Sequence, residues 1–267
     1  MPIMKFYPNG GSAGNPNPVN THQRAKRGKV QGWTPRAARN QRNFFFSVDT
    51  GSLTGHGFSF TLTLRDCPPT AAEFHRMRDA LMKRLARLGM IRGHWLVEWQ
   101  RRGVPHLHGV AYFEDANAGY HIVSKWLEIA SDFGAGLRGQ DCKPIHAIRG
   151  WLQYLAKHGS RGVSHYQRSN DNVPKEWKEK TGRLWGKVGD WPIREPMRFR
   201  VDREGYWQYR RVVRRYCLSA ARKESNWRSV SYLRRMLKSA DRPTSEVRGV
   251  ADWVPLDVQI RIVLWLG

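Results

Sequence analysis

Two histidines separated by one residue, His106 and His108, are the side chains in this sequence best placed to bind a metal. Alternate residues of a β-strand face the same side, so a strand here would project both imidazoles from one face and Leu107 from the other. The preceding run HWLVEWQ also alternates, and the short segment RRGVP between the two runs predicts an antiparallel hairpin. A turn centred on Gly103 would place Glu98 directly opposite His108 and on the same face. Two imidazoles and a carboxylate then form half of a mixed nitrogen and oxygen site for a divalent metal.

A second stretch, RGWLQYLAKHG at 149–159, supplies a nucleophile. Its apolar residues recur at helical spacing, and Tyr154 and Lys157 fall on the opposite side of the expected helix. A phenol has an ordinary pKa of about 10, and a nearby metal ion together with a lysine one turn away would favour the phenolate. A phosphodiester polarised by the metal would then be open to attack by the tyrosine. The product would be a covalent phosphotyrosine that conserves the energy of the broken bond.

Each of these signals has a purely structural alternative. An isolated His-x-His pair also fits two half-buried histidines on a sheet, and Tyr154 viewed alone fits an ordinary packing residue. The register of Glu98 and the downstream tyrosine helix favour the functional reading. His94 and His56 are weaker candidates for additional metal ligands.

The charge of the chain indicates a polyanionic partner. Among 267 residues, 46 are Lys or Arg and 22 are Asp or Glu, which gives a formal net charge of +24. Such a field attracts nucleic acid, in preference to an anionic membrane, and makes binding dependent on salt. The 12 tryptophans suit base stacking, although the core is expected to use most of them.

The remaining composition favours a soluble cytoplasmic protein. The three cysteines form no CxxC pair, which argues against a disulfide framework and against a zinc finger. The sequence shows no apolar run long enough to span a bilayer and no signal peptide, so no membrane partner is expected.

The order of elements predicts an α+β fold with three regions. Residues 1–42, rich in Gly, Pro, Asn and Arg, read as a basic, disordered tail. Residues 43–190 read as the main domain, with an antiparallel sheet and helices. Residues 191–267 read as a basic, helix-rich C-terminal region.

Within the main domain the expected elements alternate between strands and helices. The helix after Pro69 begins with Thr70 and Glu73 at capping-box spacing and stops near Gly89. Pro144 suggests an edge position for the strand at 142–148. The expected order is strands at 44–48 and 58–64, a helix at 70–88, the hairpin, a helix at 121–133, the strand at 142–148 and the helix at 149–158.

Three motifs in this order resemble those of the HUH endonucleases, specifically the single-tyrosine initiators of rolling-circle plasmids and single-stranded DNA phages. FTLTL at 60–64 resembles the first, strand-borne motif, HLH at 106–108 the His-hydrophobe-His motif, and YLAK at 154–157 the Tyr-x-x-Lys motif. Glu98 lies where such proteins often place a third metal ligand. HLH and YLAK are fairly specific together, FTLTL is not, and the resemblance covers about residues 43–160.

The resemblance implies a five-stranded antiparallel sheet flanked by helices and a requirement for Mg²⁺ or Mn²⁺, bound by Glu98, His106 and His108. It implies that Tyr154, assisted by Lys157, nicks single-stranded DNA or an extruded origin hairpin. The products would be a 5′-phosphotyrosine and a free 3′-hydroxyl that primes rolling-circle replication, after which the ends are rejoined.

A one-tyrosine enzyme is expected because Tyr166 lies well past Gly159, beyond the nucleophile helix. No Walker A motif is present, so a host helicase and polymerase are expected partners. A transposase or relaxase of the same superfamily is one alternative. The other is a non-enzymatic basic nucleic-acid-binding protein, which accounts for the charge but leaves Glu98, HLH and YLAK unexplained.

Overall fold

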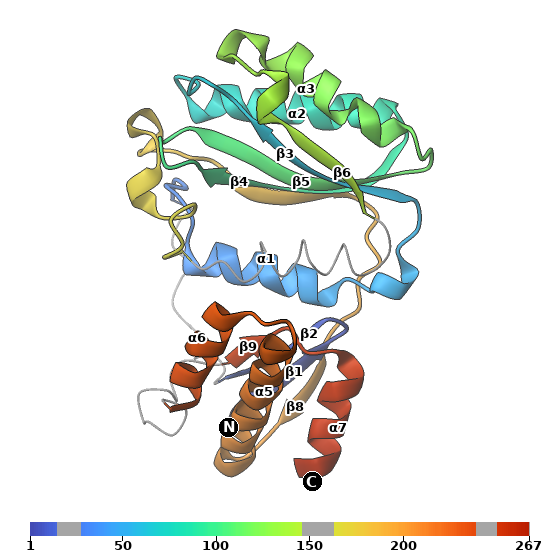
Figure 1. The fold of residues 1–267 in the computed structure, drawn as a ribbon, viewed down its shortest axis with the longest axis vertical. Coiled ribbons are helices and arrows are strands. Elements are labelled where there is room, and N and C mark those ends of the chain that lie inside the picture. Colours follow the sequence, from blue (N-terminus) through green and yellow to red (C-terminus); the bar gives the residue numbers. More distant parts are fainter. Residues whose placement is uncertain (15–27, 146–162, 239–249, 267) are drawn as a thin grey trace. The chain divides into compact units, whose positions relative to one another are not determined.

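The computed structural model describes residues 1–14, 28–145, 163–238 and 250–266, and these residues form two compact units, each with its own sheet (Figure 1). Unit 1 contains the described residues of 1–24, 43–50 and 193–267, and unit 2 those of 25–42 and 51–192. Both ends of the chain therefore contribute to one unit, whereas the sequence suggested a tail, a main domain and a C-terminal region in succession.

Unit 2 is built on a five-stranded sheet in which every neighbouring pair is antiparallel. This confirms the predicted α+β fold with a five-stranded antiparallel sheet flanked by helices. The strands, in spatial order, are β6 (Asp141–Ile145), β3 (His56–Thr63), β5 (Pro105–Phe113), β4 (Met90–Trp99) and β7 (Trp185–Gly189).

Two helices, α2 (Ala71–Arg87) and α3 (His121–Ala130), cover one face of this sheet (Figure 1). Thr70 and Glu73 form the predicted capping box at the start of α2, and Gly89 follows its end with a φ of +81°. The face of the sheet beneath the helices is apolar, as the alternation predicted. Its buried side chains include Phe58, Phe60, Leu62, Trp95, Val97, Leu107 and Ala111.

The turn between β4 and β5 fixes the register of the hairpin. The Gln100 N–H donates to the Val104 carbonyl and the Gly103 N–H to the Gln100 carbonyl, both at 2.9 Å. Gly103 has a φ of +77°, so it is the left-handed residue that follows the turn rather than its centre. As a result Glu98 pairs with His106, and the predicted pairing with His108 was wrong by two residues. A shift of two leaves both side chains on the predicted face, because side chains alternate with a period of two.

The edges of the sheet lie at β6 and β7. The edge position of β6 agrees with the prediction from Pro144. The strand β7 forms although its sequence, WGKVG, is rich in glycine. Here Gly186 makes room for the Trp95 ring, since a Cβ at residue 186 would lie 2.6 Å from it.

The short 3₁₀ helices are η1 (Thr50–Ser52), η2 (Ala118–Tyr120), η3 (Ser131–Phe133), η4 (Leu137–Gly139), η5 (Asn170–Asn172) and η6 (Lys175–Trp177).

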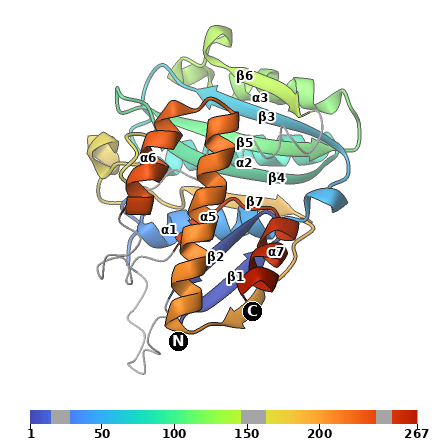
Figure 2. The ribbon, with the colours of Figure 1, turned by 60° about the horizontal axis from the view of Figure 1, so that its bottom comes forward.

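Unit 1 contains a four-stranded antiparallel sheet whose strands come from opposite ends of the sequence (Figure 2). In spatial order the strands are β8 (Met197–Arg200), β1 (Ile3–Tyr7), β2 (Gly10–Gly14) and β9 (Val250–Asp252). Three helices accompany it: α5 (Arg203–Lys223), α6 (Trp227–Lys238) and α7 (Leu256–Leu266). The core of this unit forms where Met4 and Phe6 of β1 pack with Tyr209 of α5 and Ile262 of α7.

The N-terminal region therefore differs from the expected disordered tail in its described parts. Met4, Phe6 and Tyr7 are buried, and their partners are C-terminal residues that a local composition of Gly, Pro and Asn cannot reveal. Residues 3–14 consequently form a hairpin.

The predicted strand at 44–48 was also wrong, because most of these residues end helix α1 (Pro35–Ser47). The phenylalanines favour a strand, but the helix starts with a capping contact in which the Ala37 N–H donates to Thr34 Oγ1, and Pro35 suits the first helical position. Phe45 and Phe46 are fully buried at the other end of the helix.

Among the helices of the described residues, none has both the length and the apolar character needed to cross a membrane. Cys67, Cys142 and Cys217 are free thiols in the structure.

Candidate metal centre

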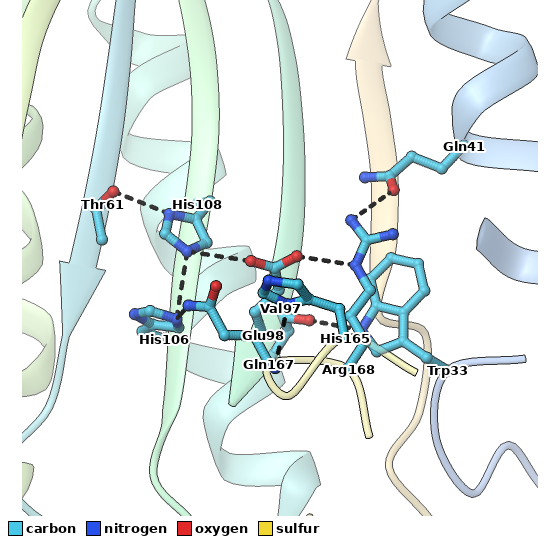
Figure 3. A network of polar contacts seen from close by, with 10 residues as sticks. All are labelled: Trp33, Gln41, Thr61, Val97, Glu98, His106, His108, His165, Gln167 and Arg168. Atoms are coloured by element: carbon cyan, nitrogen blue, oxygen red, sulfur yellow. Dashed lines mark hydrogen bonds and ion pairs between the residues drawn. The ribbon is translucent and has the colours of Figure 1, made fainter. Parts of the chain in front are cut away.

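Three potential metal ligands meet on the sheet face opposite α2 and α3 (Figure 3). Glu98 comes from β4, and His106 and His108 come from the adjacent strand β5. Their exposed fractions are 0%, 8% and 4%, and one donor atom from each lies within 4.8 Å of the others. The structure thus brings together all three ligands that the sequence predicted.

Two of the donor separations lie close to those expected around one small divalent cation. The Nε2 atoms of His106 and His108 lie 3.2 Å apart, and His108 Nε2 lies 3.5 Å from Glu98 Oε2. Two donors that each lie about 2.1 Å from a shared ion are separated by roughly 3.0–3.4 Å, depending on the angle between them. A donor set of two imidazoles and one carboxylate is also chemically suited to a divalent metal.

Strand β3 orients one of the two imidazoles. Thr61 pairs with His108 across the sheet, and Thr61 Oγ1 lies 2.9 Å from His108 Nδ1. When Nδ1 carries the proton and donates to this hydroxyl, the Nε2 lone pair faces Glu98 and His106, which is the tautomer that a metal ligand needs. The FTLTL strand therefore contributes a supporting residue to the cluster.

Arg168 holds the carboxylate from the other side (Figure 3). Its Nε donates to Glu98 Oε1 at 2.8 Å, which leaves Oε2 as the oxygen on the histidine side. Both side chains of this ion pair are fully buried, so each depends on the other for compensation of its charge. The pair fixes both the charge and the orientation of Glu98.

Arg168 is itself held by residues that precede the sheet in sequence. Its second terminal nitrogen donates to Gln41 Oε1 at 3.0 Å, and its guanidinium lies 4.1 Å from the centre of the Trp33 ring. The Trp33 indole N–H in turn donates to the Val97 carbonyl at 2.9 Å, next to Glu98. Segments far apart in the sequence thus converge behind the carboxylate.

Gln167 contacts the first histidine of the pair at Nε2, the ring nitrogen that lies nearest to His108. Its Nε2 lies 3.2 Å from His106 Nε2, and its backbone carbonyl accepts a 2.8 Å hydrogen bond from the Trp99 N–H of β4. The side chains of Gln167 and Arg168 therefore contact His106 and Glu98, respectively.

Little in the sequence indicates that these supporting residues lie at the cluster. A tryptophan in a Gly- and Pro-rich stretch, Trp33, was the one usable signal that part of residues 1–42 packs against the fold. Gln167 and Arg168 lie in a polar, irregular segment with no motif, so only the three-dimensional structure shows their contacts.

The other predicted site residues have different outcomes. Tyr154 and Lys157 lie outside the described residues, so their placement stays a prediction. His94 and His56 are not members of the metal-ligand cluster. His94 is buried and its ring stacks on Trp185, about 13 Å along β4 from Glu98 at the usual rise of a strand.

Comparison with known proteins shows extensive similarity to replication proteins. The chain is 45% identical to a "Putative replication protein" of Xylella fastidiosa strain 9a5c, over 97% of this chain and 94% of the relative. It is 46% identical to a second such protein, from strain Temecula1, over 95% of this chain and 99% of the relative. It is 39% identical to the "Replication-associated protein G2P" of Pseudomonas phage Pf3, over 91% of this chain and 88% of that protein. No family model and no solved structure matches the chain.

Proposed function

The chain belongs to the family of replication proteins that includes the replication-associated protein G2P of phage Pf3, and on this premise we propose that it initiates replication by nicking DNA at an origin. The observation that carries the proposal is the buried cluster of Glu98, His106 and His108. Two imidazoles and a carboxylate, with one donor atom from each lying within 4.8 Å of the others, are a donor set suited to a divalent metal.

Glu98, His106 and His108 would hold Mg²⁺ or Mn²⁺, which when bound supplies Lewis-acid polarisation of a phosphodiester. The chain's own residues prepare the site for this ion. Arg168 keeps the Glu98 carboxylate charged and turned so that Oε2 faces the histidines. Thr61 would keep a lone pair on His108 Nε2 by accepting a hydrogen bond from the Nδ1–H group.

The proposed nucleophile is the hydroxyl oxygen of Tyr154. It attacks the phosphorus atom of the scissile phosphodiester, the bond from phosphorus to O3′ breaks, and a phosphotyrosine forms at the 5′ end. The phenol loses one proton and the departing 3′ oxygen gains one, so the step is balanced without oxidation or reduction. Lys157 favours the phenolate by its positive charge. The reverse reaction rejoins DNA ends without an external energy source.

The substrate is single-stranded DNA or an extruded hairpin at the origin. The net charge of +24 suits a DNA ligand and implies binding that weakens as salt rises. The free 3′-hydroxyl primes rolling-circle synthesis by a host polymerase, with a host helicase to unwind the duplex in the bacterial cytoplasm.

The proposal is tested by incubating the full chain with labelled single-stranded DNA from the origin of its own replicon and Mn²⁺, followed by a denaturing gel. A covalent protein–DNA band is expected, and it should disappear in Tyr154→Phe and after chelation of the metal. Tyr120→Phe is the matched control, because Tyr120 is an exposed tyrosine whose ring packs on Phe58, on the sheet face opposite the cluster. This variant should retain the band.

Each of the other possible results of the adduct assay would contradict one part of the proposal. If Tyr154→Phe still forms the adduct, the nucleophile is a different residue. If the wild-type protein forms no adduct on any sequence of its origin, the non-enzymatic nucleic-acid-binding role is favoured. If the adduct forms but the nicked strand primes no synthesis with helicase and polymerase present, a transposase or relaxase role is favoured.

A further inference from the structure

In the segment 165–168, HYQR, the side chains of Gln167 and Arg168 contact the metal-ligand cluster, whereas that of Tyr166 is exposed. Gln167 and Arg168 are buried and contact His106 and Glu98. Tyr166, the next residue along the chain from Gln167, is 45% exposed, which is high for a large aromatic side chain so close to a buried site. Contact with the cluster explains the burial of Gln167 and Arg168 but gives no role to Tyr166.

The segment is held rigidly by its backbone. The N–H groups of Arg168 and Ser169 both donate to the His165 carbonyl, at 2.8 Å and 2.9 Å, which closes a tight turn. The Asn172 side-chain amide donates to the Tyr166 carbonyl, and the Gln167 carbonyl accepts from the Trp99 N–H of β4. The position of Tyr166 is therefore set by the sheet.

Tyr166 lies beside a second aromatic ring and an arginine side chain. The His165 and Tyr166 rings lie with their centres 4.8 Å apart and their planes inclined by 34°. The guanidinium of Arg101, from the turn between β4 and β5, lies 5.2 Å from the centre of the Tyr166 ring. Arg102 of the same turn donates to the Leu64 and Arg65 carbonyls at the end of β3, which anchors the turn. We call His165, Tyr166 and Arg101 the stacking platform.

We propose that the stacking platform binds an unpaired nucleobase of single-stranded DNA beside the phosphate that is cut at the metal-ligand cluster. An exposed aromatic ring next to an arginine offers a flat surface and a positive charge, which together suit the π-face of a base and the phosphate attached to it. Every base has such a face, whereas stacking within a duplex hides it, so the platform would select single strands with little regard to sequence.

The location of the platform supports a role near the cleaved bond. Consecutive Cα atoms are about 3.8 Å apart, so the backbone of Tyr166 is one residue from that of Gln167, whose side chain contacts His106. A strand that passes the cluster would meet Tyr166 within a few nucleotides. The inference rests on the proposed function, because it assumes that single-stranded DNA is the substrate.

The test measures DNA binding by fluorescence anisotropy in the presence of a chelator, so that no cleavage occurs. The probes are a labelled oligodeoxythymidylate of about 20 nucleotides, longer than the 4–16 nucleotides bound by typical single-strand-binding folds, and an abasic deoxyribose-phosphate strand of equal length. Tyr166→Ala should weaken binding of the thymidylate strand by about 5- to 150-fold, which corresponds to the loss of one stacked base. Binding of the abasic strand should change little.

Three further variants separate stacking from other effects. Tyr166→Phe retains the ring and should bind both strands as the wild type does. Tyr120→Ala removes another exposed tyrosine and should change neither affinity. Arg101→Gln should weaken binding of both strands and reduce the slope of log affinity against log salt by about 0.7, the value for one phosphate contact on a single strand. Thermal melting of each variant shows whether it is folded.

The inference is overturned if Tyr166→Ala leaves the affinity for thymidylate unchanged, or if it weakens binding of both strands equally. It is also overturned if Tyr166→Phe forms no covalent adduct in Mn²⁺ while Tyr154→Phe does, because the Tyr166 hydroxyl would then be the nucleophile. If the wild type forms no adduct but Tyr166→Ala loses the preference for bases, the platform is supported and the proposed cleavage is rejected.

Discussion

Replacing Arg168 by methionine tests whether the buried ion pair compensates the charge of Glu98. Methionine retains much of the length that packs against Trp33 but removes the positive charge. Because both members of the pair are fully buried and their atoms lie 2.8 Å apart, the substitution leaves an uncompensated carboxylate inside the protein. Breaking such a pair costs about 3–5 kcal/mol, against a total stability of about 5–15 kcal/mol for a typical domain. The variant should be strongly destabilised or unfolded.

A second substitution shows whether charge is the cause. Glu98→Gln removes the negative charge with little change of shape, so the double variant of Arg168→Met and Glu98→Gln should recover most of the lost stability. A double-mutant cycle then gives the coupling energy between the two positions. This comparison remains informative even if the single variant fails to fold.

The assay is hydrogen exchange of the β4 and β5 amides, measured in a chelator. Exchange in these strands reports the opening free energy of unit 2, whereas one melting curve could mix the transitions of two units. The matched control is Arg84→Met, because Arg84 and Glu128 also lie 2.8 Å apart but are 37% and 50% exposed. That variant should lose only about 0–1 kcal/mol. Equal losses in Arg168→Met and Arg84→Met, or no recovery in the double variant, would refute the role given to the buried charge.

Three other predictions concern metal binding and pH. His108→Ala should weaken Mn²⁺ binding in calorimetry and leave DNA binding at low salt nearly unchanged, because it removes a ligand and no surface charge; an equal loss of both would contradict a dedicated metal site. Thr61→Val should weaken Mn²⁺ affinity by about 10- to 100-fold through loss of the hydrogen bond to His108 Nδ1, and unchanged affinity would show that this bond does not orient the ring. Burial, together with the charge of Arg78, lowers the pKa of His75 below its ordinary value of 6.5, so the folded protein favours the neutral imidazole. The contribution of His75 to stability is therefore present above pH 6.5 and is lost as the pH falls, by at most about 1.4 kcal/mol per pH unit. Urea unfolding between pH 7 and pH 5 should show a smaller loss in His75→Gln than in the wild type, and identical losses would contradict the assignment.

Local patterns in the sequence were sufficient to predict which three side chains come together in the candidate metal site. Alternation with a period of two placed His106, His108 and Glu98 on one face, and this conclusion holds for any shift of register by an even number of residues. The pairing itself depended on the conformation of one glycine, Gly103, which the sequence does not specify. The predicted partner of Glu98 was therefore wrong while the predicted cluster was correct.

The supporting residues required information that no local pattern contains. Arginine is seldom buried, and Arg168 is buried where Glu98 meets it from one distant segment and Trp33 and Gln41 meet it from another. The prediction of a disordered N-terminal tail was wrong for the same reason, because Met4 and Phe6 obtain their apolar surroundings from C-terminal helices. A low-complexity composition predicts disorder only when no distant surface is available to cover its few apolar side chains.

The sheet of unit 1 also determines when this protein can finish folding during its synthesis. Strand β1 pairs with β8 and strand β2 with β9, so the first strands leave the ribosome long before their partners exist. At about 5–20 residues per second, translation of the intervening chain takes on the order of 10–40 s. During that time the sheet of unit 2 can form, because its strands β3 to β7 are complete before β8 is made. If synthesis stopped before β8, the released chain would contain all residues of the metal-ligand cluster, but β1 and β2 would lack their outer partner strands. Chaperones and proteases would recognise such a chain as incompletely folded.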